Sequence, residues 1–174
     1  MKKWIAGIAL LSLFGCLGED DTPQYNPIEQ LEVDIAAIEQ HLTANNITTV
    51  EDEQTGIRYI ILEEGNGMDP TDGDVVLVNY ELYNFEGDLL DTNVESVAVD
   101  GGIHNEERNY QPLQFQLGTN GLIPGFQRST LLLSEEGKGD FYIPSVWCYQ
   151  NYGSANIGPN ENLRFIIELV KVNP

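Results

Sequence analysis

The sequence predicts an α+β fold in which an antiparallel β-sheet wraps around one short α-helix, with an N-terminal amphipathic helix ahead of the sheet. Three observations lead to this prediction. Residues 26–46 carry the signals of a single helix, residues 56–172 alternate short apolar segments with glycine or aspartate turns, and only residues 125–133 of that region have a helical pattern. Many strands with one short helix are typical of an α+β domain. A chain of 174 residues has room for one such domain and for further segments at its ends.

The first 15 residues have the features of a secretory signal peptide. Lys2 and Lys3 precede an apolar run, residues 4–14, that is too short to span a bilayer as a permanent helix. The run ends at Leu13-Phe14-Gly15-Cys16, which resembles the bacterial lipobox, where the precursor is cut before the cysteine and the cysteine is acylated. We therefore expect a signal peptide over residues 1–15 and a lipid on Cys16. The lipid would anchor the protein to a membrane of the cell envelope, and we expect this to be the outer membrane. The alternative is an ordinary signal peptide with an incidental cysteine.

Residues 16–25 are predicted to form an acidic tether, because Glu19-Asp20-Asp21 and the polar residues around it cannot build a core. An acidic run just behind the cysteine also resembles the surface-export signal of Bacteroidetes lipoproteins. Whether the protein faces the periplasm or the cell surface therefore stays open.

Residues 26–46 are predicted to form one amphipathic helix. Asn26 is suited to the N-cap, Pro27 to the first helical position and Glu29 to a capping box, and Asn45-Asn46 would end the helix. Apolar residues recur every three or four positions, at Ile28, Leu31, Ile35, Ile38 and Leu42. This stripe needs a partner. It either docks on its own domain or forms a homodimer through residues 26–46.

Strand signals fill residues 56–174, which we assign to one domain. Residues 57–62 and 75–82 are rich in branched side chains, residues 113–117 alternate apolar and polar, and Phe141-Tyr142-Ile143 and Leu163–Val172 complete the set. Turns are predicted at Asp72-Gly73-Asp74 and Glu86-Gly87-Asp88. The one helical candidate, residues 125–133, carries Phe126 and a run of leucines.

Charge and cysteine content exclude several classes of function. The net charge of −20 would repel a phosphate backbone, so no nucleic-acid partner is expected. His41 and His104 have no companions at metal-ligand spacing, so no metal site is predicted. Cys148 is the only cysteine besides Cys16, and we expect it to be a buried small hydrophobic residue rather than a nucleophile.

Taken in order, the motifs of residues 56–172 resemble those of the FKBP-type (immunophilin) peptidyl-prolyl cis-trans isomerases. Each motif is weak alone, and the signal lies in their order and spacing. They are Gly65-Asn66-Gly67, Gly73-Asp74-Val75, Asn79-Tyr80, Gly87, Leu90-Asp91, Phe115-Gln116-Leu117-Gly118, Leu122-Ile123-Pro124-Gly125-Phe126, Glu136-Gly137-Lys138, Tyr142-Ile143-Pro144, Pro159-Asn160 and Leu163-Arg164-Phe165.

The chemistry of such an isomerase needs no cofactor, and none is implied here. Resonance gives the prolyl amide C–N bond partial double-bond character and a rotation barrier of about 18–20 kcal/mol. The twisted amide has less charge separation than the planar one, so an apolar pocket favours it relative to water. The site therefore needs an apolar bowl for the proline ring and donors that hold the flanking carbonyl groups.

The resemblance assigns these roles to particular residues. Asp91 stands at the family's pocket aspartate, and the main-chain N–H of Ile123 stands where a substrate carbonyl is held; the alternative for Asp91 is a surface aspartate after a hairpin. The substrate-binding walls are Tyr80, Leu90, Leu113, Leu122, Phe126, Ile157 and Phe165.

The pocket tyrosine is Tyr149 or Tyr152. Tyr152-Gly153 reproduces the family's Tyr-Gly pair, but the residue count from Ile143-Pro144 and onward to Pro159-Asn160 favours Tyr149. We prefer Tyr149, because Tyr152 would require an insertion followed by a compensating deletion.

Some features depart from the family pattern. Leu90 and Leu113 replace common phenylalanines, Phe126 stands where many members have tryptophan, and residues 92–111 form a long polar insertion, predicted to be either a disordered excursion or a lid at the pocket rim. The resemblance implies an isomerase of reduced activity that assists the folding of proline-containing exported proteins. The alternative is a catalytically weak or inactive binding module in an envelope complex of the gliding type.

Overall fold

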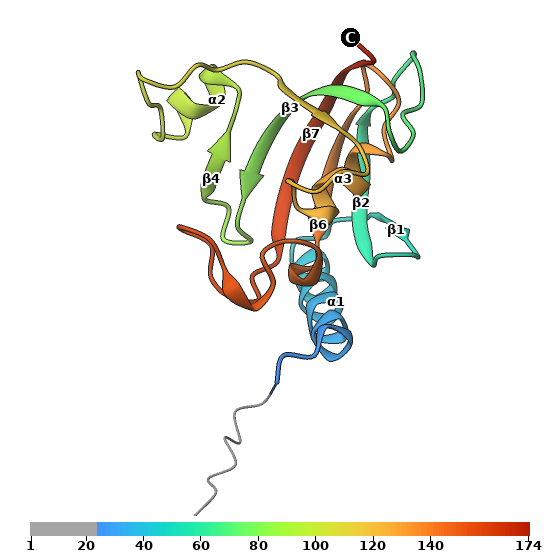
Figure 1. Ribbon diagram of the computed structural model, residues 1–174. Coiled ribbons are helices and arrows are strands. Elements are labelled where there is room, and N and C mark those ends of the chain that lie inside the picture. Colours follow the sequence, from blue (N-terminus) through green and yellow to red (C-terminus); the bar gives the residue numbers. More distant parts are fainter. Residues whose placement is uncertain (1–23) are drawn as a thin grey trace, which may run out of the picture.

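The computed structural model describes residues 24–174. The predicted signal peptide, Cys16 and most of the predicted tether lie outside these residues. Seven strands form one antiparallel sheet in the order β1-β2-β6-β7-β3-β4, and β5 pairs with β3 (Figure 1). They are β1 (Val50–Asp52), β2 (Ile57–Glu63), β3 (Val75–Tyr83), β4 (Leu89–Thr92), β5 (Leu113–Gln116), β6 (Lys138–Ile143) and β7 (Leu163–Val172). The helices are α1 (Pro27–Ala44), α2 (Glu95–Asp100) and α3 (Pro124–Thr130), with short 3-10 turns η1 (Ser145–Trp147) and η2 (Gln150–Tyr152).

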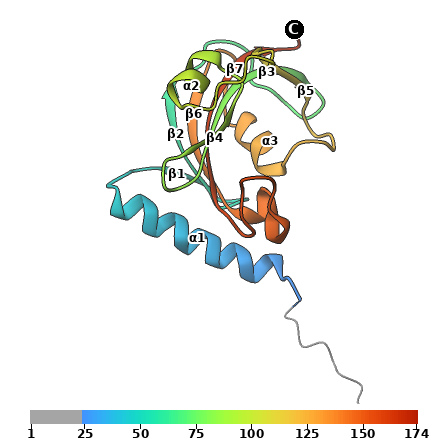
Figure 2. The same cartoon turned by 90° about the vertical axis from the view of Figure 1, so that its left-hand side faces the viewer.

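The sheet curves around α3, and this confirms the predicted α+β architecture (Figure 2). Alternate residues of the central strands point into the space between sheet and helix. Val76 and Val78 of β3 and Phe165 and Ile167 of β7 are buried there with Phe126 of α3. The domain therefore has one main apolar core, on the concave side of the sheet.

Two strands share one edge of β3 and leave a gap between them. β5 pairs with residues 75–78 of β3, and β4 pairs with residues 81–83. The side chain of Asn93 fills the gap: it accepts a hydrogen bond from Tyr80 N at 2.7 Å and donates to Val78 O at 2.9 Å and Gln111 O at 3.1 Å. Asn93 thereby satisfies main-chain groups of β3 and joins the two ends of the insertion 92–111.

Helix α1 packs on its own domain. Asn26 caps it, as predicted, by accepting a hydrogen bond from Ile28 N at 3.1 Å. Ile38 and Leu42 are buried against Tyr142 of β6, on the opposite face of the sheet from α3. Ile28, at the start of the predicted stripe, is 73% exposed. The docking interpretation of the stripe therefore accounts for most of its apolar surface.

The structure corrects several details. The leucines at 131–133 do not extend α3, because the N–H groups of Leu132 and Leu133 bond three residues back, to Ser129 and Thr130, and turn the chain. Strand β1, helix α2 and both 3-10 turns were not predicted, since each is too short to show a period. The insertion 92–111 is not a disordered excursion: it contains α2, which packs beside β4 where Gly101 approaches the Leu89 side chain.

Among residues 24–174, no helix has the length and apolar character needed to cross a membrane.

Candidate active site

An apolar cavity of about 190 Å³ opens on the concave side of the sheet, above α3. All the predicted site residues of the domain line it, except Leu90 and Ile157. The lining consists of Tyr80, Leu82, Asp91, Leu113, Gly121, Leu122, Ile123, Phe126, Tyr149 and Phe165.

Phe126 forms the base of this cavity and is only 3% exposed. Its ring centroid lies 5.3 Å from that of Phe165, and 5.7 Å from those of Tyr80 and Phe115. The ring of Tyr80 meets it at 83°, an edge-to-face arrangement that aromatic pairs favour. The aromatic walls therefore hold one another in place, and the cavity is preformed.

Leu90 and Ile157 are partly buried and pack against the core, but they do not line the cavity. Leu82 and Gly121 line it and were not predicted. Leu82 could have been found from sequence, because it lies two residues after Tyr80 on β3 and so faces the same side of the sheet.

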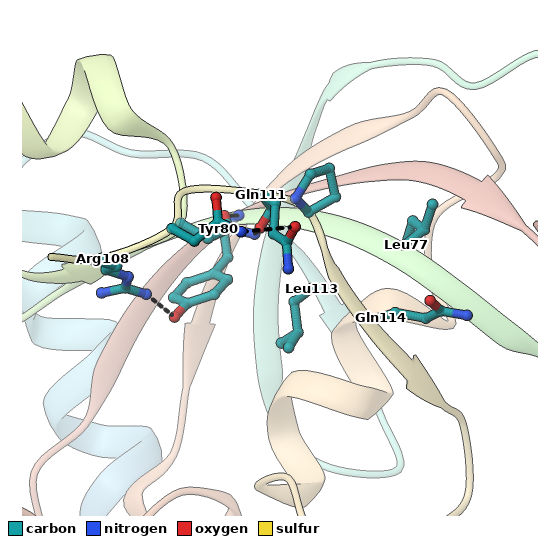
Figure 3. Close-up of a pocket in the computed structure, with 9 residues that line it drawn as sticks. Leu77, Tyr80, Arg108, Gln111, Leu113 and Gln114 are labelled. Carbon is teal, nitrogen blue, oxygen red and sulfur yellow. Dashed lines mark hydrogen bonds between the residues drawn. The ribbon is translucent and has the colours of Figure 1, made fainter.

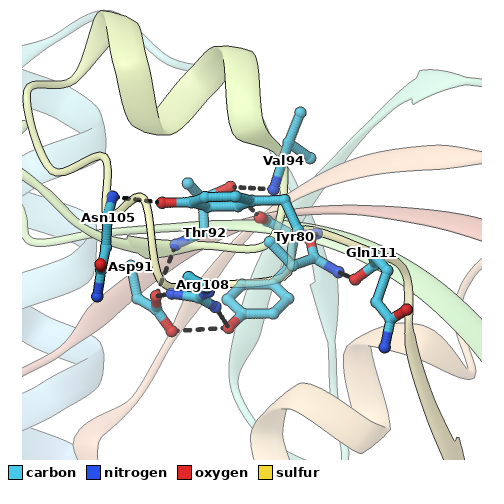
Figure 4. Close-up of polar contacts among 9 residues, drawn as sticks. Tyr80, Asp91, Thr92, Val94, Asn105, Arg108 and Gln111 are labelled. Carbon is cyan, nitrogen blue, oxygen red and sulfur yellow. Dashed lines mark hydrogen bonds and ion pairs between the residues drawn. The ribbon is translucent and has the colours of Figure 1, made fainter.

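A polar network borders the cavity (Figure 4). The Tyr80 hydroxyl donates to Asp91 Oδ2 at 2.7 Å, and Arg108 Nη1 donates to Asp91 Oδ1 at 2.5 Å. Arg108 Nη2 also donates to the Tyr80 hydroxyl at 3.2 Å, and Thr92 N donates to Asp91 Oδ1 at 2.9 Å. Both oxygens of the Asp91 carboxylate thus accept hydrogen bonds, and this fixes the orientation of the carboxylate at the cavity rim.

Burial raises the pKa of Tyr80 to about 12, and its hydrogen bond to Asp91 acts in the same direction. Burial likewise raises the pKa of the Tyr149 phenol. Both phenols are therefore protonated at neutral pH and can act as hydrogen-bond donors.

Arg108 was not identified from sequence. It comes from the insertion 92–111 and also lines a second, more polar cavity of about 570 Å³ next to the first (Figure 3). Tyr80 and Leu113 line both cavities, so they form the wall between them. The insertion thus reaches the rim of the apolar cavity through the Arg108 side chain, whereas its helix α2 lies beside β4 and does not line the cavity.

The loop before α3 brings Leu122 and Ile123 to the cavity. Gln127 of α3 holds this loop: its Oε1 accepts from Gly118 N at 3.0 Å, and its Nε2 donates to Thr119 O at 3.0 Å and Leu122 O at 3.1 Å. Ile123 is the residue just before Pro124. Its main-chain N–H bonds to no other group of residues 24–174, so it is available to a ligand.

The two candidate tyrosines occupy different environments. Tyr149 is half-buried and lines the cavity, whereas Tyr152 is 82% exposed. The segment that carries Tyr149 lies close to α3 because residue 125 is glycine: a Cβ there would lie 2.4 Å from Ile143 Cγ2 and 3.0 Å from Trp147 O. Trp147 of the same segment also donates a hydrogen bond from Nε1 to Thr55 O at 2.8 Å, which ties the segment to the turn before β2.

No group of three or more His, Cys, Asp or Glu residues suited to hold a metal ion occurs in the described part of the chain. Cys148 is buried in the core, and burial raises the pKa of its thiol. It is therefore a packing residue at neutral pH, as expected.

Comparison with known proteins gives consistent results. The model of a family described as FKBP-type peptidyl-prolyl cis-trans isomerase matches residues 67–170. The chain is 37% identical over 125 residues to "Probable FKBP-type peptidyl-prolyl cis-trans isomerase FkpA" of Neisseria meningitidis serogroup B, an alignment that covers 71% of this chain and 40% of that protein. It is 31% identical over 133 residues to the peptidyl-prolyl cis-trans isomerase Mip of Coxiella burnetii, covering 75% of this chain and 51% of that protein.

Among solved structures, the crystal structure of FkpA from Escherichia coli superposes with a TM-score of 0.62 and 28% sequence identity, over 85% of this chain and 63% of that one. The chain thus spans about two-fifths of the length of the Neisseria relative and about half of the length of the Coxiella relative.

Proposed function

Because the chain belongs to the FKBP-type peptidyl-prolyl cis-trans isomerase family, we propose that it catalyses rotation about Xaa–Pro bonds in unfolded or partly folded proteins. The observation that carries this proposal is the preformed apolar cavity between Tyr80, Phe126 and Phe165, which is also lined by the hydrogen-bonded pair Tyr80–Asp91. Prolyl isomerisation takes tens to hundreds of seconds without a catalyst, so an enzyme for it has a clear use in folding.

In the proposed mechanism, the proline ring enters the cavity and rests on Phe126. The apolar walls exclude water, and this favours the twisted amide, which has less charge separation than the planar one. The Ile123 N–H and the Tyr149 hydroxyl hold the carbonyl groups on either side of the ring. Arg108 and Tyr80 hold the Asp91 carboxylate at the rim through hydrogen bonds, so that this charged group does not turn into the apolar cavity.

Tyr149, rather than Tyr152, is the proposed donor. It lines the cavity, and its hydroxyl forms no hydrogen bond with other groups of residues 24–174, whereas the Tyr80 hydroxyl is occupied by Asp91. Leu90 and Ile157 are proposed to support the walls from behind, since they pack against the core without lining the cavity.

A binding module without turnover is the second candidate. It is favoured by the insertion 92–111, which places Arg108 at the rim of the apolar cavity and supplies Asn93, Asn109 and Gln111 to the polar cavity beside it. Such a module would hold one partner in an envelope complex.

A protease-coupled assay on residues 24–174 separates these candidates. This fragment contains both apolar clusters of the structure, so it retains the described core. Catalysed isomerisation of a short Xaa-Pro peptide supports the enzyme. A rate equal to the uncatalysed one, together with measurable binding of a proline-containing peptide, supports the module.

We also propose that the protein is a lipoprotein of the cell envelope, anchored in the outer membrane through Cys16, with residues 16–25 as an acidic tether between the anchor and the folded part of the chain. The support is the basic, apolar and lipobox-like order of residues 1–16. Cys16→Ser should release the protein from membranes or leave the precursor uncleaved, and Cys148→Ser should change neither property. Unchanged mass and membrane partition for Cys16→Ser would refute the anchor.

A homodimer through residues 26–46 would have to use the outer face of α1, where Ile28 and Val33 are the large exposed apolar residues. We propose instead that α1 serves its own domain, because Ile38 and Leu42 are already buried there. Sedimentation of residues 24–174 should show a monomer. A dimer that Ile28→Ser and Val33→Ser abolish would restore the other interpretation.

A further inference from the structure

A buried carboxylate joins α1 to the segment that carries Tyr149. Asp34 of α1 is only 1% exposed. Its carboxylate accepts hydrogen bonds from Ser145 Oγ at 2.7 Å, Val146 N at 3.2 Å and Gln30 Nε2 at 2.8 Å. No basic side chain of residues 24–174 forms an ion pair with it. A carboxylate buried among neutral donors is costly unless those bonds are all made, so its environment must be well ordered.

The contacts form a closed ring of three residues. Ser145 N donates to Asn162 Oδ1 at 2.9 Å, and Asn162 Nδ2 donates back to the main-chain oxygen of Asp34 at 3.3 Å. Ser145 is itself fully buried. The ring therefore ties α1, η1 and the residue just before β7 together at one point.

This point is four residues from Tyr149, along a segment with little freedom. Gln150 Nε2 donates to Val146 O at 3.2 Å, and the Tyr149 carbonyl accepts from Tyr152 N and Gly153 N. Cys148, between η1 and Tyr149, is buried in the core. A shift of Ser145 and Val146 is therefore passed on to Tyr149 rather than absorbed by a loose loop.

We propose that Asp34 is a positioning residue that fixes Tyr149 at the cavity through Ser145 and Val146. The inference rests on the proposed function of the cavity. The family model matches residues 67–170, and Asp34 lies outside this range. On this view α1 is more than a spacer behind the tether, since it completes the support of the site.

The test is a double-mutant cycle on residues 24–174, with the specificity constant for an Xaa-Pro peptide as the readout. Asp34→Ala leaves the Ser145 hydroxyl and the Val146 N–H buried without their acceptor, so the segment must shift to satisfy them. We expect a loss of about threefold to tenfold in the Tyr149 protein and less than about twofold in the Tyr149→Phe protein, because residues that act as a unit are not additive. Equal losses in the two backgrounds would overturn the proposal.

Two further variants separate positioning from general destabilisation. Asp34→Asn should keep most of the activity that Asp34→Ala loses, because the amide oxygen of the new asparagine can still accept hydrogen bonds from Ser145 and Val146. Its NH2 group can donate to the Gln30 side chain once the amide of Gln30 has flipped to present its oxygen. Glu135→Ala is the matched control: Glu135 is 9% exposed and accepts from Lys171 Nζ and Val172 N, away from the cavity. It should leave the specificity constant unchanged at temperatures where the protein is folded.

Trp147 gives a readout that does not depend on activity, because it is the only tryptophan of residues 24–174 and lies in η1. Asp34→Ala should increase the quenching of its fluorescence by acrylamide in the folded protein, and Glu135→Ala should not. If Asp34→Ala does not fold, Ser145→Ala, which removes one donor and fits the same space, should give a smaller change in the same direction.

The outcomes distinguish the two proposals. A wild-type protein that shows only the uncatalysed rate refutes the isomerase function, and the positioning role is then decided by the Trp147 quenching alone. An active wild type whose quenching and rate are insensitive to both Asp34→Ala and Ser145→Ala refutes the positioning role and leaves the isomerase function standing.

Discussion

Tyr149→Phe is the substitution that most sharply probes the polar side of the site. It removes one hydroxyl from the cavity wall and keeps the ring that packs there. The hydroxyl has no partner among residues 24–174, so its loss breaks no internal hydrogen bond and should barely affect folding. A hydrogen bond between neutral groups contributes about 0.5–1.5 kcal/mol. If Tyr149 makes such a bond in the transition state, the specificity constant should fall by about twofold to tenfold.

The assay is protease-coupled isomerisation of a short Xaa-Pro peptide, with melting curves recorded in parallel. Tyr152→Phe is the control, because the Tyr152 side chain is 82% exposed and lies outside the cavity. It should be silent in both measurements. A loss for Tyr152→Phe with none for Tyr149→Phe would refute the assignment, and unchanged specificity constants for both variants would show that neither hydroxyl bonds to the substrate.

Three further predictions concern stability. Phe126→Ala should abolish catalysis and cost roughly 3–5 kcal/mol of unfolding free energy in urea titrations, because a buried ring that contacts three others is replaced by a cavity; a stability loss below about 1 kcal/mol would contradict the packing described. Deleting residues 24–46 should cost roughly 3–6 kcal/mol, the value of burying Ile38 and Leu42, and an unchanged melting curve would show that α1 packs on nothing. Folding raises the pKa of Tyr80 and Tyr142 to about 12, so the stability that these two phenols contribute is fully present below pH 10 and is lost as the pH rises from about 10 to 12. Denaturant titrations across this range should show a fall in unfolding free energy, and Tyr80→Phe should make that fall smaller.

The strongly periodic elements could be predicted from sequence. The helix Pro27–Ala44 lies within the predicted segment 26–46, and the strand Leu163–Val172 has the predicted bounds, because capping residues and long alternating patterns are local signals. The order of short motifs was enough to indicate the family and most residues that line the cavity.

The features that were missed depend on contacts between distant residues. Arg108 lies 17 residues from Asp91, in an insertion without any pattern, so nothing local indicates that they meet. Leu90 and Ile157 were expected in the cavity wall from their motif positions, whereas they pack against the core without lining the cavity. Asp34 lies between Leu31 and Ile35 in the apolar stripe, and a carboxylate at a core-facing position was a signal that could have been noticed.

On the proposed mechanism, the apolar cavity itself accelerates prolyl isomerisation. The most direct measurement is the rate of cis-to-trans conversion of an Xaa-Pro peptide with increasing amounts of residues 24–174, for the wild type and for Phe126→Ala at a temperature where both are folded. We expect a rate that rises in proportion to the concentration of the wild-type protein and stays at the uncatalysed value for Phe126→Ala. A wild-type rate that does not rise with protein concentration, or a Phe126→Ala protein that is folded and equally active, would contradict it.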